Sequence, residues 1–264
     1  MIRIRVWGLL LFITAPLLAV AADPTMNPRY LGGMWQSEHF MFLIANTPKL
    51  PRTQQMIDRY AAAIKNGQII YTAWTSCRPG AISGMAMAMN SIAVLQADKD
   101  ITISLEEPRM TRRIRLDAKH PGAIVPSYLG DSVGHWDGNT LVVDTIGFNG
   151  DFELDAAAQP TSKQLHTVER FTKSADGKRI AVEITITDPV YYRAPFKIER
   201  DWVIGSRRHQ FEYDCMENPR SEEFSHTLFV KELYRPTCVS YQGAGREHSH
   251  MYCGADQHYE ESKK

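Results

Sequence analysis

The sequence carries no excess of either charge and lacks the common catalytic motifs. Its 264 residues include 30 basic and 30 acidic side chains, so no strongly basic field is available to hold nucleic acid. It contains no G-x-S-x-G elbow, P-loop, G-x-G-x-x-G loop or H-E-x-x-H pair, which are typical of serine hydrolases, nucleotide-dependent enzymes and zinc proteases. We therefore expect no nucleic-acid partner, no cofactor and no metal ion.

Cysteine is scarce, and its spacing is unlike that of a zinc site. The chain has four cysteines and no C-x-x-C, and they are Cys77, Cys215, Cys238 and Cys253. In an oxidising compartment four cysteines can form two disulfides in any of three connectivities. We favour Cys77 with Cys215 and Cys238 with Cys253, because the last two bracket a short loop.

Long apolar runs are confined to the start of the chain. Arg3 and Arg5 precede the apolar residues 6–18, and the small residues Ala19 and Ala21 follow. This order is typical of a cleaved secretory signal peptide over residues 1–21. A retained membrane anchor is the less favoured alternative, because the run is shorter than the ~20 residues of a spanning helix. We expect a periplasmic or extracellular protein without stable membrane insertion.

The remaining chain is predicted as one domain with a flanking segment at each end. Residues 22–67 form an N-terminal arm with a helix over 53–65, which Thr53 can cap. Apolar residues recur there at helical spacing, namely Met56, Ile57, Tyr60, Ala61 and Ile64. Residues 68–240 form a β-domain, and residues 241–264 form a polar, His-rich tail.

Short alternating runs and tight turns indicate a mainly β fold from residue 68 onward. The expected strands are 69–74, 91–95, 101–105, 111–116, 132–136, 140–146, 165–171, 179–187, 196–203 and 209–214. Asp137-Gly138 and Asp176-Gly177 have the chemistry of hairpin turns between such runs. Because closure removes exposed sheet edges, we expect an antiparallel meander closed into a lipocalin-like β-barrel with one N-terminal helix. A two-sheet sandwich is the alternative.

One segment carries a family resemblance. Residues 134–148, which read GHWDGNTLVVDTIGF, resemble the G-x-W-[DE]-G-[DN]-T-L-V-V-D-T-x-G-F motif of a large, uncharacterised family of secreted bacterial proteins. Matching stretches follow in order, with RRI at 112–114 before the motif and HTVERF at 166–171 and CMEN at 215–218 after it. The resemblance implies a small lipocalin-like barrel and no settled activity. Members commonly have His-Ser where Asp131-Ser132 stands here, so a reaction that used that histidine would not be shared.

Several polar residues of these motifs are candidates for a site. We expect His166 to act as general base or acid, with Asp144 and Glu169 as carboxylates near it. In an alternating strand His166 and Arg170 share one face, whereas Glu169 lies on the other. Asp144 lies on the apolar side of its strand and requires a partner, for which the candidates are Arg113, Arg170 and Arg200.

Ligand contacts are expected from four further side chains. Arg113 or Arg170 would hold an anionic group, and Trp136 and His135 would contact the rest of the ligand. The alternative interpretation of the polar cluster is an internal salt-bridge network that fixes strand register. Of the late acidic residues, Glu217 is the best catalytic candidate, because a disulfide at Cys215 would hold it at one end of the barrel.

These observations predict a secreted, small-molecule-binding barrel. An isomerase, lyase or hydrolase that needs no cofactor would act there on a small, partly apolar, anionic compound. The alternatives are a non-catalytic carrier for a hydrophobic ligand and a structural protein of the envelope, and a fold of this kind does not choose between them. The sequence leaves the oligomeric state open.

Overall fold

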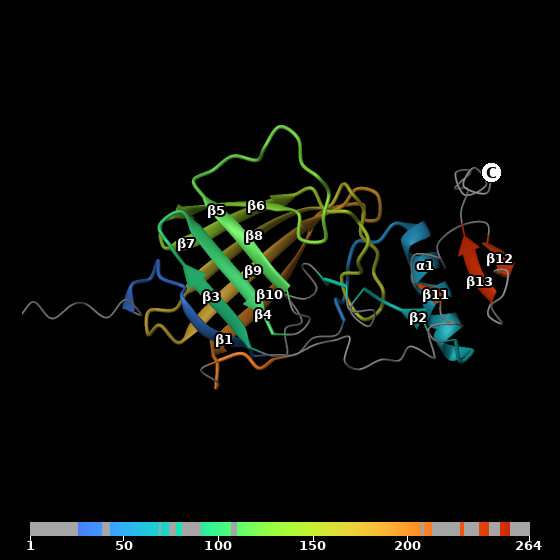
Figure 1. The fold of residues 1–264 in the computed structure, drawn as a ribbon, viewed down its shortest axis with the longest axis horizontal. Coiled ribbons are helices and arrows are strands. Elements are labelled where there is room, and N and C mark those ends of the chain that lie inside the picture. The colour runs from blue at the N-terminus through green and yellow to red at the C-terminus, as the bar shows by residue number, and fades with distance from the viewer. Residues whose placement is uncertain are drawn as a thin grey trace, which may run out of the picture.

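A computed structural model of the chain shows a β-barrel with a helix and short sheets beyond one of its ends (Figure 1). The structure describes residues 26–38, 43–68, 70–73, 78–80, 91–106, 110–206, 209–212, 228–229, 238–242 and 249–253. Within these ranges no helix has the length and apolar character needed to cross a membrane.

Nine strands close into the barrel, so the predicted fold class is confirmed. They are β1 (Gly33–Ser37), β3 (Ile92–Gln96), β4 (Asp100–Leu105), β5 (Met110–Leu116), β6 (Asp131–Asp137), β7 (Thr140–Ile146), β8 (His166–Lys173), β9 (Arg179–Thr187) and β10 (Phe196–Ile204). The expected arm contains β1, a strand that the sequence analysis did not anticipate. It closes the ring by pairing with β10 on one side and with β3 on the other.

One pairing departs from the expected antiparallel meander. β5 and β6 run parallel, with Ile114 opposite Ser132, and the remaining neighbours in the ring are antiparallel. The reason is geometric, because strand direction cannot alternate all the way round a closed ring with an odd number of strands. Parallel neighbours need a crossover rather than a tight turn, and residues 117–130 provide it. This loop arches over β5 and β6 in Figure 1.

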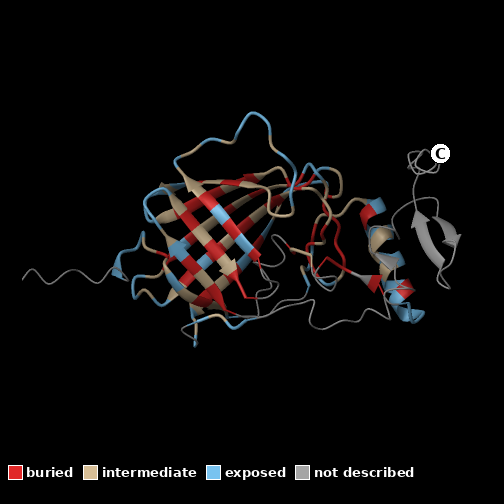
Figure 2. Cartoon of the chain, viewed as in Figure 1, coloured by how far each residue is buried: buried red, intermediate tan, exposed pale blue. Residues whose placement is uncertain are grey.

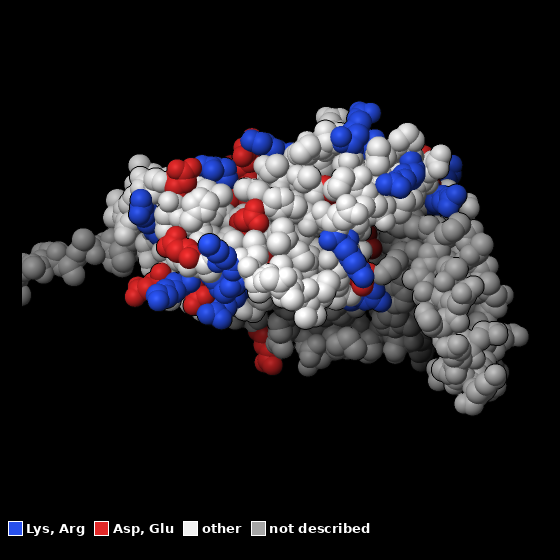
Figure 3. Space-filling model, turned by 90° about the horizontal axis from the view of Figure 1, so that it is seen from above, with Lys and Arg blue, Asp and Glu red and all other residues white. Residues whose placement is uncertain are grey.

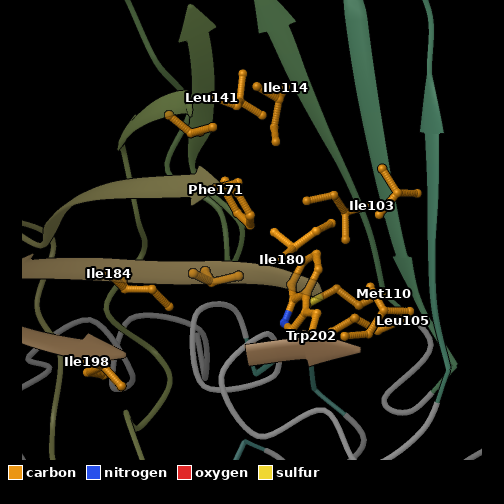
Figure 4. Close-up of a cluster of buried hydrophobic side chains, with 14 of the residues drawn as sticks. Ile103, Leu105, Met110, Ile114, Leu141, Phe171, Ile180, Ile184, Ile198 and Trp202 are labelled. Carbon is orange, nitrogen blue, oxygen red and sulfur yellow. The ribbon is translucent and has the colours of Figure 1, made fainter. Parts of the chain in front are cut away.

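Side-chain alternation directs one face of every barrel strand inward. Figure 2 shows how buried and more exposed positions alternate along the strands, and Figure 4 shows buried side chains of several strands that point toward one another. Ile92, Ile101, Ile114 and Leu141 are 0% exposed, so no water-sized space lies beside them. These four side chains therefore leave no room for a ligand beside them inside the barrel.

The one helix in the described ranges is α1 (Pro51–Lys65), close to its predicted bounds. The prediction that Thr53 caps it was wrong. The N-cap is Leu50, whose side chain makes no capping bond, and proline lies at the start of the helix, where its missing N–H is tolerated. The buried Thr53 hydroxyl instead donates to the carbonyl oxygen of Tyr191 at 2.6 Å, which fastens the helix to the loop after β9.

Three predictions near the ends of the β-domain need correction. Of the expected strand 69–74, the described residues 70–73 contain the short β2 (Ile70–Tyr71), which lies outside the barrel and pairs in parallel with β11 (Leu228–Phe229). Residues 209–212 of the expected strand 209–214 hold no strand, and its last two residues lie outside the described ranges. The expected tail overlaps a hairpin of β12 (Cys238–Gln242) and β13 (Ser249–Cys253).

The hairpin register bears on the expected disulfides. Cys238 lies directly opposite Cys253 in the pairing of β12 with β13. Opposite residues of antiparallel strands have Cα atoms about 4.5–5.5 Å apart, a separation that a disulfide can bridge. The backbone is thus compatible with this bond, which stays a prediction. Cys77 and Cys215 lie outside the described residues.

Candidate functional site

The barrel interior holds a buried ion pair. On β5, Arg112 points inward and donates from Nη1 to Oε1 of Glu169 on β8 at 2.9 Å, while its Nη2 bonds the other carboxylate oxygen. Its Nε donates to the hydroxyl of Ser132 at 2.9 Å, and Nη2 also donates to the hydroxyl of Thr145 at 2.7 Å. Arg112 is 3% and Glu169 0% exposed. Glu169 is thus sealed from solvent, as in the internal network that the sequence analysis gave as its alternative.

His166 and Asp144 meet on the outside of the barrel rather than in its mouth. Inward positions on β8 are buried and alternate with half-buried ones, so His166 and Arg170 share the outer face, opposite Glu169. Asp144 lies on the outer face of the adjacent strand β7, where its Oδ2 is 2.7 Å from Nε2 of His166. The side chains are 41% and 39% exposed, so solvent reaches both groups.

The contact extends along the wall into an outer-wall relay, defined here as Arg115, Asp131, His120, Asp144 and His166. In this relay Nε2 of His120 lies 2.9 Å from Oδ1 of Asp144, and its Nδ1 lies 2.6 Å from Oδ1 of Asp131. Arg115 donates from Nη2 to both oxygens of Asp131, at 2.7 and 2.9 Å. Four neighbouring strands and the crossover loop therefore contribute to one hydrogen-bonded row.

The two imidazoles stabilise the ionised form of Asp144. Partial burial by itself raises the pKa of Asp144, but hydrogen bonds and charge from His166 and His120 outweigh it and lower the pKa below its ordinary value. At neutral pH the carboxylate therefore accepts from both rings. The expected partners of Asp144 were arginines, and this prediction was wrong because a loop residue, His120, occupies the space above β7 instead.

The three arginines considered as partners lie elsewhere. Arg113 faces outward on β5 and pairs with Asp100 through two contacts of 2.8 Å, which lower the pKa of that carboxyl. Arg170 donates to Asp137 at 3.0 Å. Arg200 faces the barrel interior and is 7% exposed.

The remaining predicted site residues do not join the relay. On β6, Trp136 is half-buried and packs against the barrel core, whereas His135 is exposed on the outer face. Glu217 lies outside the described residues. Of the eight candidates, the structure thus brings together only His166 and Asp144 on the outer wall.

Three residues of the relay were missed, namely Arg115, His120 and Asp131. His120 lies in a loop just before Pro121, where neither alternation nor a motif marks a site. Asp131 was visible as a departure from the resembled family, since it stands where members commonly have histidine. In the structure that carboxylate contacts both Arg115 and His120, so the departure marked a real polar position.

A groove lies on a different part of the outer wall. It has a volume of about 420 Å³ and is lined by β1, β3, β4 and the arm residue Tyr30. Met34, Ala93 and Leu95 give it an apolar surface, and Leu95 is 66% exposed. None of the eight predicted site residues lines it, and neither does any member of the outer-wall relay.

Charge and metal-ligating residues give no further site in the part of the chain that can be described. Figure 3 shows acidic and basic side chains lying side by side over the left part of one face, rather than a field of one sign. No group of three or more histidine, cysteine or acidic side chains there has an arrangement that could hold a metal ion.

Neither a protein-family model nor a curated protein matches this chain. The resemblance carried by residues 134–148 therefore stays a prediction, and the case for a function depends on the geometry of the residues themselves. That geometry offers one half-exposed imidazole that is oriented by an ionised carboxylate.

Proposed function

We propose that the protein is a secreted, small-molecule-binding barrel that acts as an acid–base enzyme without a cofactor, with His166 as the base. The contact between Nε2 of His166 and Oδ2 of Asp144, at 2.7 Å, carries this proposal. An ionised carboxylate only accepts, so Nε2 bears the proton and Nδ1 of a neutral ring keeps its lone pair. Nδ1 has no hydrogen-bond partner among the described residues, and the ring is 41% exposed.

The arrangement can move one proton. Nδ1 of His166 takes a proton from an acidic C–H group or from a water molecule that attacks the substrate, and it returns that proton to the product or leaving group. Asp144 stays ionised and stabilises the imidazolium that forms meanwhile. These steps suit an isomerase, a lyase or a hydrolase, because none of the three requires an electron acceptor.

In this proposal the substrate binds on the outer wall, where His166 is half-exposed. Beside His166 that wall includes Val168 and Ile146, both half-buried, which suits a partly apolar compound. Arg170 lies on the same face four residues further along β8, roughly 13 Å away at the usual rise of a strand. It would meet an anionic group at the far end of an elongated ligand.

A screen of aromatic carboxylates, phenols and medium-chain fatty acids by thermal shift tests this function. We expect at least one compound to raise the melting temperature, and ¹H NMR in D₂O to show exchange of its acidic protons or its cleavage. His166→Ala should abolish that chemistry while changing the melting temperature of the free protein little. His209→Ala, which removes an exposed imidazole that belongs neither to the relay nor to the predicted ligand contacts, is the matched control and should keep the chemistry.

The outcomes separate the alternatives. Chemistry that survives His166→Ala contradicts the proposal, and so does a loss that follows only from unfolding of the variant. Absence of any stabilising compound favours a structural protein of the envelope, for which the filled interior and the buried pair of Arg112 with Glu169 are already suited.

The groove on β1, β3 and β4 favours a second candidate function, that of a carrier. Its volume of about 420 Å³ lies in the range of small-molecule sites, and its surface is mainly apolar. A carrier would bind a hydrophobic compound there and release it unchanged. Leu95→Asp should then abolish the thermal shift while His166→Ala preserves it. For the enzyme, Leu95→Asp should preserve the thermal shift and His166→Ala should abolish the chemistry.

A further inference from the structure

The carboxylate of Asp144 is shared by two imidazoles, and only His166 belongs to the proposed catalytic pair. Oδ2 faces Nε2 of His166 at 2.7 Å, and Oδ1 faces Nε2 of His120 at 2.9 Å. Each oxygen thus has its own donor. Two contacts, rather than one, fix the plane of the carboxylate and the direction in which it accepts from His166.

His120 lies between two carboxylates. Its two nitrogens face carboxylates, Asp131 at 2.6 Å and Asp144 at 2.9 Å. Because ionised carboxylates only accept, both contacts are hydrogen bonds only when both nitrogens carry protons. Arg115 donates to both oxygens of Asp131, so the two side chains form a charge-assisted pair.

We infer that His120 is a positioning residue, which fixes Asp144 and places a positive charge one carboxylate away from His166. The inference rests on the proposed function, since it assigns a role toward the proposed base. Along the outer-wall relay the charged groups alternate in sign from Arg115 to Asp144, and their charges cancel. His166 lies at the end of this row, next to Asp144.

The loop that carries His120 is fastened to the end of β7. Ser127 donates its N–H to the carbonyl oxygen of Gly147 at 3.0 Å, and Asn149 donates its N–H to the carbonyl oxygen of Ser127 at 2.8 Å. Ile124 lies so close to Gly147 that a β-carbon there would be 2.4 Å from its Cγ2 atom. His120 is therefore held over Asp144 by packing on the far side of the loop as well as by its own bonds.

Few other ionisable groups face His166. Its cross-strand neighbour on β9 is Thr187, which carries no charge. Along β8 the next charged side chain on the same face is Arg170, whose partner is Asp137. Before β8, Lys163 is exposed to solvent, where its charge is screened. Apart from Asp144 itself, His120 is thus the ionisable group that hydrogen bonds connect to His166.

The rate at which diethyl pyrocarbonate modifies His166 tests the inference without any substrate. The neutral ring attacks a carbonyl carbon of the reagent and ethyl carbonate leaves, so the rate rises with pH until the ring is fully neutral. Peptide mapping by mass spectrometry gives this rate for His166 separately. In His120→Ala we expect the half-maximal rate to move to higher pH by about half a unit, because a positive charge near the ring is lost.

Lys119→Ala is the matched control. It removes a positive charge from the neighbouring exposed position of the same loop and should leave the half-maximal pH where it is in the wild type. In addition, the pKa of Asp144, followed by the ¹³C shift of its carboxyl, should rise in His120→Ala but not in Lys119→Ala. A purely structural role for His120 would change the melting temperature without moving either titration.

Equal half-maximal pH values for His120→Ala and Lys119→Ala would overturn the inference. His120→Gln provides a second route if His120→Ala fails to fold, because its amide N–H can still donate to Asp144 but carries no charge. It should move the titration in the same direction as His120→Ala. Failure of the proposed function is a separate result, since it would appear as ligand chemistry that persists in His166→Ala.

Discussion

At the scale of single residues, two of the carboxylate–cation groups lie in opposite environments. The pair of Arg112 with Glu169 is enclosed in the barrel, where every strong contact is internal. The relay that ends at His166 lies on the wall, where solvent and ligands reach it. Breaking the first should therefore affect stability, and breaking the second should affect reactivity.

Arg112→Met tests the role of the enclosed pair. It leaves the carboxylate of Glu169 buried without its cation, so we expect a loss of about 3–5 kcal/mol in the free energy of unfolding, measured by urea denaturation. Arg113→Met removes the charge of the next residue, whose partner Asp100 lies at the surface, and should leave the free energy of unfolding nearly unchanged. The double variant Arg112→Met/Glu169→Gln should recover part of the loss, and a loss under about 1 kcal/mol in Arg112→Met would contradict this account.

Glu153 gives the protein a pH-dependent stability that the sequence did not indicate. Burial raises the pKa of Glu153 to about 7, against the opposing effects of the N–H of Ala73, which donates to Oε2 at 2.8 Å, and of Arg78. The folded state therefore binds a proton that the unfolded state releases near pH 4.5. The contribution of Glu153 to the free energy of unfolding is greatest below about pH 4.5. It decreases by about 3 kcal/mol in total as the pH rises to about 7.

Glu153→Gln should remove this dependence while keeping an acceptor for Ala73. Relative to the wild type, we expect the variant to gain stability as the pH of urea denaturation rises from 5 to 8. Glu183→Gln, which removes a carboxylate paired with Lys197 at the surface, serves as the comparison and should show no such gain. Parallel curves for Glu153→Gln and the wild type would refute the assignment.

At the scale of elements, the crossover loop 117–130 connects the topology of the barrel with the candidate site. The parallel pairing of β5 with β6 requires a loop that crosses from one end of the strands to the other. That same loop carries His120 to the outer face of β7. The relay is thus a consequence of the one parallel pair in the ring.

Gly147→Ala should loosen this loop. Gly147 has a φ of +77°, and an added β-carbon would lie 2.4 Å from Ile124. Backbone strain at residue 147 and displacement of Ile124 together should lower the free energy of unfolding by about 2–4 kcal/mol. Amide exchange over residues 119–127 should become faster. Gly138→Ala is the matched control, because its φ is +60° but nothing lies within 4 Å of the added carbon. Only backbone strain remains there, so we expect the free energy of unfolding to fall by about 1 kcal/mol. Equal costs for the two variants would show that Ile124 does not restrain the loop.

The sequence predicted those elements whose pattern is local. Strands such as β7 and β9 have the predicted bounds, because alternation and the turns at Gly138 and Gly177 are properties of neighbouring residues. It did not reveal β1, since residues 33–37 contain few apolar side chains and become a strand only by pairing with β3 and β10. It also did not reveal His120, whose role depends on where a loop crosses the sheet.

The direction of side chains was predicted better than their partners. Alternation correctly put His166 and Arg170 on one face and Glu169 on the other, because the period of a strand is two. It could not say which face was inside. Nor could it distinguish Arg112, which meets Glu169 across the barrel, from the adjacent Arg113, which meets Asp100 at the surface.

At the scale of the whole molecule, closure of the barrel depends on its earliest strand. β1 joins β3 and β10, and its Trp35 is 3% exposed within the core. Removing β1 would leave β3 and β10 with unpaired N–H and C=O groups, which are a template for pairing with another chain. It would also remove the large buried surface of Trp35, which is worth about 3–5 kcal/mol when such a side chain is truncated.

A chain that starts after Ser37 should therefore self-associate, as measured by light scattering, and should exchange the amides of β3 and β10 faster than the full chain. A chain that starts at Met26 keeps β1 and should stay closed, which makes it the control for truncation as such. If the shorter chain neither self-associated nor exchanged these amides faster than the control, the other strands would form a stable sheet without β1. The outer-wall relay lies on β5 to β8, away from the edges that the truncation exposes. The reactivity of His166 should therefore decline in the shorter chain only if opening of the barrel also disturbs these four strands.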